Sequence, residues 1–262
     1  MNTEIEEAGR RIVVIVDPHI KASDDYFVYK DGMDLQNQDQ PEGNVSNIFI
    51  REGLTSTKPF YGDCWPGNST WIDFLNTNAQ DYWGSLFSYD VFKGSNYMYQ
   101  FWNDMNEPAV FSTDSHTMPL DAIHVKTDGT EVTHLEVHNA YGALHQRSSY
   151  RGILKRDEGM AEQYRPFVLT RSFFLGSQKF GAYWTGDNRA VFEEIQGSIS
   201  MIQQLGIAGH PFGGSDIPGF YGYPTDDLFV MFYQAGMWYP FMRAHSQDVM
   251  LPFAMKDREP WF

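Results

Sequence analysis

The stretch MYQFWNDMNEP, residues 98–108, decides the fold class of this 262-residue chain. Its first five residues form a largely apolar run of the kind that a buried strand carries. Four polar residues follow within six positions, among them Asp104 and Glu107. The pattern predicts a strand whose carboxyl end gives way to a loop that holds two acids.

The same layout recurs along the chain, where further apolar runs end in polar residues. These runs are RIVVIV (11–16), PFVLT (166–170), GAYW (181–184), GIAGHPF (206–212) and YPFMRAH (239–245). Helical patterns separate them, at 78–93, about 136–149, 190–205 and 225–237. Strands that alternate with helices predict a parallel sheet in an α/β fold.

The number of strands bears on the architecture. The continuous apolar run RIVVIV favours a strand covered on both faces, and the stretches 21–62 and 111–135 are expected to be long loops. In a (β/α)8 TIM barrel such loops build the active face at the carboxyl ends of the strands.

Six strands are found instead of eight, so either two strands escape the pattern or the chain is part of a barrel. One partial barrel domain, residues 1–262, is expected.

Composition excludes several classes of partner. The formal net charge of −15 disfavours binding to a nucleic acid backbone or to an anionic membrane. No apolar run is long enough for a membrane span, and the N-terminal stretch lacks the pattern of an export signal. The single cysteine, Cys64, excludes a disulfide within the chain.

Acids stand at the ends of several predicted strands: Asp17, Asp104, Glu107, Asp187 and Asp216. A parallel barrel brings the carboxyl ends of its strands to one rim, so acids far apart in sequence can face each other across a pocket. A retaining glycosidase needs two carboxyl groups about 5–5.5 Å apart, one as nucleophile and one as acid/base. Tryptophan and phenylalanine residues flank these acids and suit either sugar faces or core packing.

Longer motifs identify a family. FWNDMNEP (101–108) resembles the nucleophile signature of glycoside hydrolase family 31, and FGAYWTGDN (180–188) resembles its acid/base segment. The segments DPHIK (17–21), CWPG (64–67), RPFVLTRSFFLGSQ (165–178), GGSDIPGF (213–220) and MRAH (242–245) also match. The resemblance implies a TIM barrel and hydrolysis of α-linked glucose.

The resemblance also assigns roles by position. It implies that Asp104 is the nucleophile and Asp187 the acid/base, with Glu107 as a supporting neighbour. The substrate-binding residues that it implies are Asp17, Ile20, Trp65, Trp102, Arg171, Trp184, Asp216, Phe220 and His245. Arg171, Asp216 and His245 are expected to bond glucose hydroxyls, whereas the aromatic residues wall the subsite. No metal or cofactor is implied.

The segments TMPLDAIH (117–124) and HLEVHNAYG (134–142) resemble one branch of the family. That branch removes α-1,3-linked glucose from N-glycans in the endoplasmic reticulum lumen. The resemblance therefore implies this substrate, this location and a regulatory β subunit as partner.

Some alternatives stay open at this point. The family's barrel begins before the match to residue 11, so the chain is expected to carry strands three to eight and no flanking β domains. It could be a sugar-binding or interaction module without turnover, or an α-1,4-glucosidase or α-xylosidase. Zinc at His134 and His138, spaced four apart on a helix, is the weaker reading because no third ligand stands nearby. His124 and His145 are expected to be packed or solvated.

Overall fold

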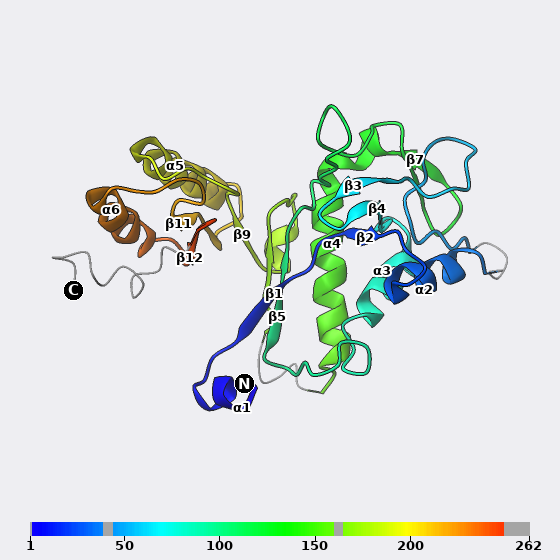
Figure 1. The fold of residues 1–262 in the computed structure, drawn as a ribbon, viewed down its shortest axis with the longest axis horizontal. Helices are drawn as coiled ribbons and strands as arrows, with labels where there is room; N and C mark the ends of the chain where they lie inside the picture. Colours follow the sequence, from blue (N-terminus) through cyan, green and yellow to red (C-terminus); the bar gives the residue numbers. More distant parts are fainter. Residues whose placement is uncertain (1, 39–43, 160–164, 249–262) are drawn as a thin grey trace. The chain divides into compact units, whose positions relative to one another are not determined.

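The computed structural model describes residues 2–38, 44–159 and 165–248. The chain divides into two compact units, Met1–Gly181 and Ala182–Phe262, and each is described by itself (Figure 1).

A parallel sheet organises the first unit. Its strands are β1 (Ile12–Ile15), β5 (Tyr99–Asn103) and β8 (Val168–Thr170), with β5 between the other two. Ile12 lies opposite Tyr99, and Phe101 lies opposite Val168. The predicted strands at 11–16, 98–102 and 166–170 are confirmed. Their carboxyl ends lead directly to Asp17, Asp104 and Arg171.

The two faces of strand β1 are not both buried, contrary to the prediction for it. Val13 and Ile15 are 44% and 48% exposed, whereas Ile12 and Val14 on the other face are partly buried. The prediction of a strand covered on both faces is wrong for this structure. The apolar run reflected a strand with one face on the core, and the second face meets no cover in the described part of the chain.

The helices of the first unit are α1 (Asn2–Glu7), α2 (Phe27–Gln36), α3 (Thr77–Ser85) and α4 (His134–Arg156), with a 3-10 turn, η1 (Ser177–Lys179). A capping box begins α4, because Thr133 and Glu136 bond reciprocally across its first turn. Helix α4 packs against α3 and against strands β5 and β8 (Figure 1). It is nine residues longer than the predicted segment 136–149, as 23 residues replace 14.

Two regions expected to be loops hold regular structure. Region 21–62 contains α2 and leads into the antiparallel sheet β2 (His19–Lys21), β4 (Gly67–Trp71) and β3 (Gly62–Cys64). Region 111–135 contains the hairpin β6 (Ile123–Val125) and β7 (Glu131–Thr133). These strands have three to five residues, too few for a clear alternation of apolar and polar positions.

The main core lies in the first unit between the parallel sheet and these additions. Trp71, Phe74, Phe101 and Tyr141 are almost completely buried in it. Asp104 therefore follows a strand that is anchored by core packing, and the position of its backbone is restricted.

The second unit contains β9 (Ala182–Trp184), β10 (Gly213–Gly214), β11 (Asp216–Pro218), β12 (Arg243–His245), α5 (Phe192–Ile207) and α6 (Asp226–Gly236). Strand β10 pairs with β9 and β11 pairs with β12, both in parallel. Only Ser215 separates β10 from β11, so they form one strand path that pairs on both sides. Among the described residues this gives six parallel strand positions, the number predicted.

Two strand boundaries in this unit were wrong. The predicted strand 206–212 covers the end of α5 and the turn after it, and the strand itself begins at Gly213. The predicted strand 239–245 shortens to Arg243–His245. Within the described residues, none of the helices has the length and apolar character needed to cross a membrane.

Candidate active site

Asp104 is partly buried at the end of β5 and is held by two donors. Its Oδ1 accepts a hydrogen bond from the backbone N–H of Met105 at 2.8 Å and lies 2.8 Å from Nη1 of Arg171. Met105 has a φ of 55°, a left-handed conformation that is uncommon for a residue other than glycine. The backbone therefore turns sharply at the residue that follows the candidate nucleophile.

Arg171 contacts three residues at the start of the loop that follows β5, namely Asp104, Met105 and Glu107. Its Nε and Nη2 donate to Oε1 and Oε2 of Glu107 at 2.8 and 3.1 Å, and Nη2 lies 3.0 Å from the sulfur of Met105. A guanidinium that meets a carboxylate through two parallel bonds is fixed in its plane. The structure thus brings together three predicted site residues, Asp104, Glu107 and Arg171.

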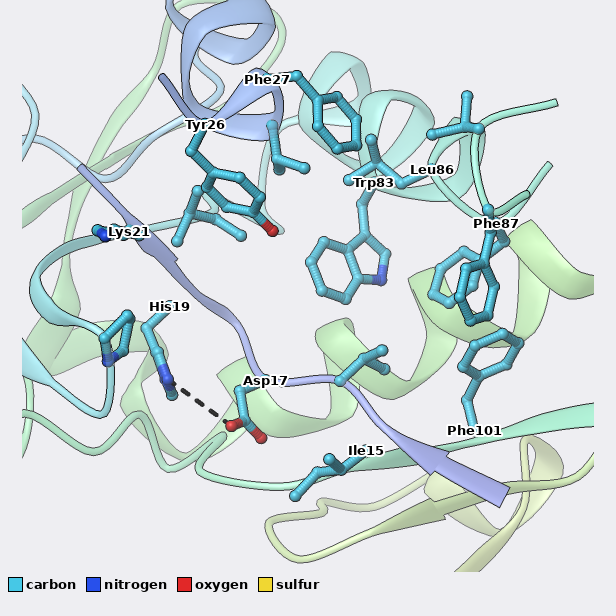
Figure 2. Close-up of a pocket in the computed structure, with 16 residues that line it drawn as sticks. Ile15, Asp17, His19, Lys21, Tyr26, Phe27, Trp83, Leu86, Phe87 and Phe101 are labelled. Carbon is cyan, nitrogen blue, oxygen red and sulfur yellow. Dashed lines mark ion pairs between the residues drawn. The ribbon is translucent and has the colours of Figure 1, made fainter. Parts of the chain in front are cut away.

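Asp17 lies close to the same charges. The pKa of its carboxyl is raised from 3.8 to about 7, mainly by burial and then by the charges of Asp104 and Glu107, against the lowering effect of Arg171. His19 Nε2 lies 3.7 Å from Oδ2 of Asp17 (Figure 2). Burial lowers the pKa of His19 to about 4, so this imidazole is neutral at pH 7 and the contact is not a salt bridge there.

A cavity of about 580 Å³ opens beside β1 (Figure 2). Its lining is mainly apolar and includes Phe27, Trp83, Phe87 and Phe101. Of the predicted site residues, only Asp17 and Ile20 reach it among those that the structure describes. Asp104 and Arg171 are not part of the lining, so the chemistry is not assigned to this cavity.

The remaining candidates of the first unit differ in exposure. Trp65 is 70% exposed and meets Phe111 edge-on with ring centroids 4.8 Å apart. Trp102 is partly buried in β5, and Ile20 is buried in β2. Trp65 is therefore the aromatic candidate of this unit that is most available to a ligand.

In the second unit, Asp187 is exposed and is followed by the buried Asn188. The Nδ2 of Asn188 donates to Oγ of Ser215 at 2.9 Å and to the carbonyl of Asp216 at 3.1 Å. Its Oδ1 accepts from the backbone N–H of Phe220 at 3.1 Å. One buried amide thereby connects the turn that carries Asp187 to strand β11, which begins at Asp216, and to Phe220 after it.

Asp216 and Trp184 are connected through Arg243. Asp216 is completely buried, and its Oδ1 accepts from Nε and Nη2 of Arg243 at 3.1 and 2.6 Å. The guanidinium of Arg243 lies 4.9 Å from the ring centroid of the buried Trp184, a cation–π arrangement. Binding of glucose hydroxyls by Asp216 stays a prediction.

Phe220 and His245 are brought together in this unit. Their rings stack with centroids 5.2 Å apart and planes at 27°. Burial, followed by the charge of Arg243, lowers the pKa of His245 to about 4. The imidazole is therefore neutral at pH 7 and suited to a hydrogen bond rather than to a charge contact.

His124, His134, His138 and His145 contact other protein groups. His124 and His145 are almost fully buried, which confirms that they are packed. His124 Nδ1 lies 2.7 Å from Oδ1 of Asp73, its Nε2 lies 2.9 Å from Nδ1 of His134, and His134 Nε2 lies 2.9 Å from Nδ1 of His138. In the described ranges, no group of three or more His, Cys, Asp or Glu side chains is arranged so that it could hold a metal ion.

Three further residues of the site escaped the sequence reasoning. Asn106, Asn188 and Arg243 stand inside the quoted motifs, but the sequence does not reveal which groups their side chains bond. Their partners come from other strand ends, which only the folded structure brings near.

A family model, "Glycosyl hydrolases family 31 TIM-barrel domain", matches residues 1–262. The predicted TIM-barrel class is thereby confirmed. Over its whole length the chain is 42% identical to "Probable glucan 1,3-alpha-glucosidase" of Oryza sativa subsp. japonica and covers 26% of that protein. The chain therefore spans about a quarter of the length of the curated relatives that it matches.

The chain is also similar to solved structures of glucosidase II. The crystal structure of a glucosidase II alpha subunit with alpha3-Glc2 bound is 40% identical, with a TM-score of 0.86 over 99% of this chain and 26% of that chain. An ER glucosidase II heterodimeric complex, of the catalytic subunit with the binding domain of the regulatory subunit, is 41% identical. Its TM-score is 0.85 over 98% of this chain and 26% of that chain.

Proposed function

Because this chain belongs to glycoside hydrolase family 31, we propose that the protein is a retaining α-glucosidase and that these 262 residues carry its two catalytic carboxyl groups. One observation carries the proposal. Asp104, the aspartate of the WNDMNEP motif, stands at a strand end with its carboxylate 2.8 Å from the guanidinium of Arg171. A neighbouring guanidinium favours the charged form that a carboxylate nucleophile requires.

The proposed reaction has two steps. In the first, a carboxylate oxygen of Asp104 attacks the anomeric carbon while Asp187 gives its proton to the departing glycosidic oxygen. This step breaks the glycosidic bond and forms a glycosyl ester on Asp104. In the second step, Asp187 takes a proton from water, the water oxygen attacks the anomeric carbon and Asp104 is released. The proposal requires the two carboxyl groups to lie about 5–5.5 Å apart.

The charges around Asp104 suit this role. Asp17, with its pKa raised to about 7, is partly protonated at neutral pH and adds less negative charge than an ordinary aspartate. Arg171 is shared between Asp104 and Glu107, so one cation serves two carboxylates. With less negative charge on Asp17 and a guanidinium beside it, the carboxylate of Asp104 is favoured in its charged form although other acids lie nearby.

The sugar-contacting set remains a proposal. Trp65 is exposed and presents a flat apolar face. Phe220 and the neutral His245 form a stacked pair in the second unit. We assign the walls of the glucose subsite to Trp65, Trp102, Trp184 and Phe220, its edge to Ile20, and its polar contacts to Asp17, Arg171, Asp216 and His245.

The relatives suggest the substrate, the partner and the location. A relative that is 42% identical is named as a glucan 1,3-alpha-glucosidase, and a solved neighbour holds alpha3-Glc2. We propose that the substrate is terminal α-1,3-linked glucose on an N-glycan. The heterodimeric neighbour supports a regulatory β subunit as partner and the endoplasmic reticulum lumen as location.

The test compares the protein with its Asp104→Asn variant. We expect the unaltered protein to release the fluorophore from an α-glucoside and the variant to lose at least about 10⁴-fold in kcat, because the nucleophile is removed. A mechanism-based fluoro-sugar should label the peptide that contains Asp104, as read by mass spectrometry. Labelling elsewhere, or unchanged turnover by the variant, contradicts the proposal.

Substrate choice is tested separately. Rates on α-1,3-linked and α-1,4-linked glucose disaccharides and on an α-xyloside rank the specificities. Faster cleavage of the α-1,3 linkage is the expected result. A folded protein that binds glucose but cleaves none of these substrates would be a sugar-binding module instead.

A further inference from the structure

A buried asparagine connects the loop of the candidate nucleophile to the loop of Arg171. Asn106 is 0% exposed. Its Oδ1 accepts from the backbone N–H of Ser172 at 2.9 Å, and its Nδ2 donates to Oγ1 of Thr170 at 2.8 Å. Longer contacts of 3.4 Å run from Nδ2 to the carbonyls of Ser172 and Gly142. The amide therefore holds the residues on both sides of Arg171.

Arg171 completes a closed arrangement of bonds. Asn106 bonds the side chain of Thr170, before Arg171, and the backbone of Ser172, after it. The side chain of Arg171 in turn reaches back to Asp104 and Glu107, in the loop that carries Asn106. The two loops are thus joined twice, once through the amide and once through the guanidinium. A shift of Asn106 would therefore move the backbone of Arg171, from which its side chain extends toward Asp104.

Helix α4 supplies a third support. At Gly142 a Cβ atom would lie 2.6 Å from the Cβ, O and Oγ atoms of Ser172. Real Cβ atoms do not approach other atoms so closely, so the backbone after Arg171 rests directly on the glycine of the helix. The Arg171 segment is held between Asn106 and α4.

We propose that Asn106 is a positioning residue, which places the guanidinium of Arg171 against the carboxylate of Asp104 through its bonds to Thr170 and Ser172. The inference rests on the proposed function, since it concerns the same site. Asn106 touches no reacting atom. Its effect arises because misplacement of an aligned charged group by about 1 Å can lower a rate by roughly a hundredfold.

A purely structural role makes a different prediction. A buried asparagine that only stabilises the fold would, when replaced, lower the melting temperature and leave the pH dependence of the surviving enzyme unchanged. A positioning role also alters the ionisation of the nucleophile, because a more distant guanidinium favours the carboxylate less. The acidic limb of the profile of kcat/KM against pH reports this difference.

The experiment uses two variants and a matched control in the full-length protein. Asn106→Ser shortens the side chain. Thr170→Val keeps the shape but removes the hydroxyl that accepts from Asn106 and donates to the carbonyl of Ser172 at 2.7 Å. The control is Asn76→Ser, since Asn76 is also 0% exposed and makes three bonds through its side chain. These bonds join it to Asn78 N–H and to the carbonyls of Val45 and Val125 at 2.9, 2.7 and 3.0 Å.

We expect Asn106→Ser to lower kcat by about 10- to 100-fold with less than about a threefold change in KM. Its acidic limb should move to higher pH, and Thr170→Val should move it in the same direction by less. Asn76→Ser should lower the melting temperature without moving the limb. An unmoved limb in Thr170→Val and Asn106→Ser, or an equal shift in the control, overturns the inference. If Asn106→Ser fails to fold, Thr170→Val alone decides.

Failure of the proposed function can be distinguished from failure of the inference about Asn106. If the unaltered protein cleaves no α-glucoside, the proposed function is wrong and the inference is judged by crystal structures of the unaltered protein and of Thr170→Val. An increase of 1 Å or more in the 2.8 Å separation of Arg171 Nη1 and Asp104 Oδ1 supports it. An unchanged separation overturns it.

Discussion

Arg171 and Glu107 meet side-on, with Nε and Nη2 of the guanidinium 2.8 and 3.1 Å from the two carboxylate oxygens. This contact leaves Nη1 directed at Asp104, which it reaches at 2.8 Å. Glu107 therefore fixes the plane in which Arg171 approaches the candidate nucleophile, and the orientation of the arginine depends on a residue that itself needs no contact with the sugar.

Replacing Glu107 should affect activity more than folding. Glu107→Gln keeps one oxygen acceptor but removes the charge and one of the two parallel bonds, so we expect kcat/KM to fall about tenfold. The matched control is Glu131→Gln, which removes the negative charge that Arg51 meets at 3.1 Å in the same unit. Steady-state kinetics of both variants test this, and equal effects would contradict it.

Gly142→Ala should destabilise the protein and disturb the site together. The added Cβ would lie 2.6 Å from Ser172, so we expect a loss of roughly 1–3 kcal/mol in the free energy of unfolding. Gly197→Ala in α5 is the control, because a Cβ there meets nothing within 4 Å. It should raise stability by roughly 0.5–1 kcal/mol. Denaturant unfolding measures both, and a neutral Gly142→Ala would be the contrary result.

Asp17→Asn should stabilise the protein at high pH. The pKa of Asp17 is raised from 3.8 to about 7 in the folded state, so the unaltered protein loses stability as the pH rises from about 4 to 7. Asparagine carries no charge at any of these values. The melting temperature of the variant should exceed that of the unaltered protein at pH 8, and the difference should shrink at pH 4. A difference independent of pH would count against the buried carboxyl as its cause.

Asn188→Ala should impair the step that needs an acid. The change frees the turn of Asp187 from Ser215 and Phe220, so proton donation becomes less well aligned. We expect a fall of about tenfold or more in kcat on an alkyl α-glucoside, whose leaving group requires a proton. A dinitrophenyl α-glucoside needs little acid catalysis, so its kcat/KM, which reports the formation of the glycosyl ester, should stay nearly unchanged. Equal losses on both substrates would indicate a general disturbance.

The sequence predicted those parts of the fold that depend on local pattern. Strands β1, β5 and β8 and the charged residues after them, Asp17, Asp104 and Arg171, follow from apolar runs that end in polar residues. The run GIAGHPF was misread because its apolar letters end helix α5 and form a turn, and the strand itself is two glycines. Glycine has no side chain from which a strand pattern could be recognised.

The supporting contacts of the site could not be predicted in the same way. Asn106 bonds Thr170 and Ser172, more than 60 positions later in the chain, and any asparagine in a loop offers the same donor and acceptor. The motif indicated the reactive aspartate, because its residue type fits the chemistry. The choice of partner for a buried amide depends on which strand ends lie next to each other, which is a property of the folded sheet.

Asp73, His124, His134 and His138 form a chain of hydrogen bonds, so the donor and acceptor roles of neighbouring rings depend on each other. When His124 is neutral and its Nδ1 donates to Asp73, its Nε2 is an acceptor, and the same assignment then passes to His134 and to His138. No ring can exchange its tautomer alone, since two hydrogens or two lone pairs would then face each other. The three imidazoles form one polar column with an all-or-none arrangement. The tautomer of His138, which is partly exposed, therefore reports on the carboxylate buried at the other end.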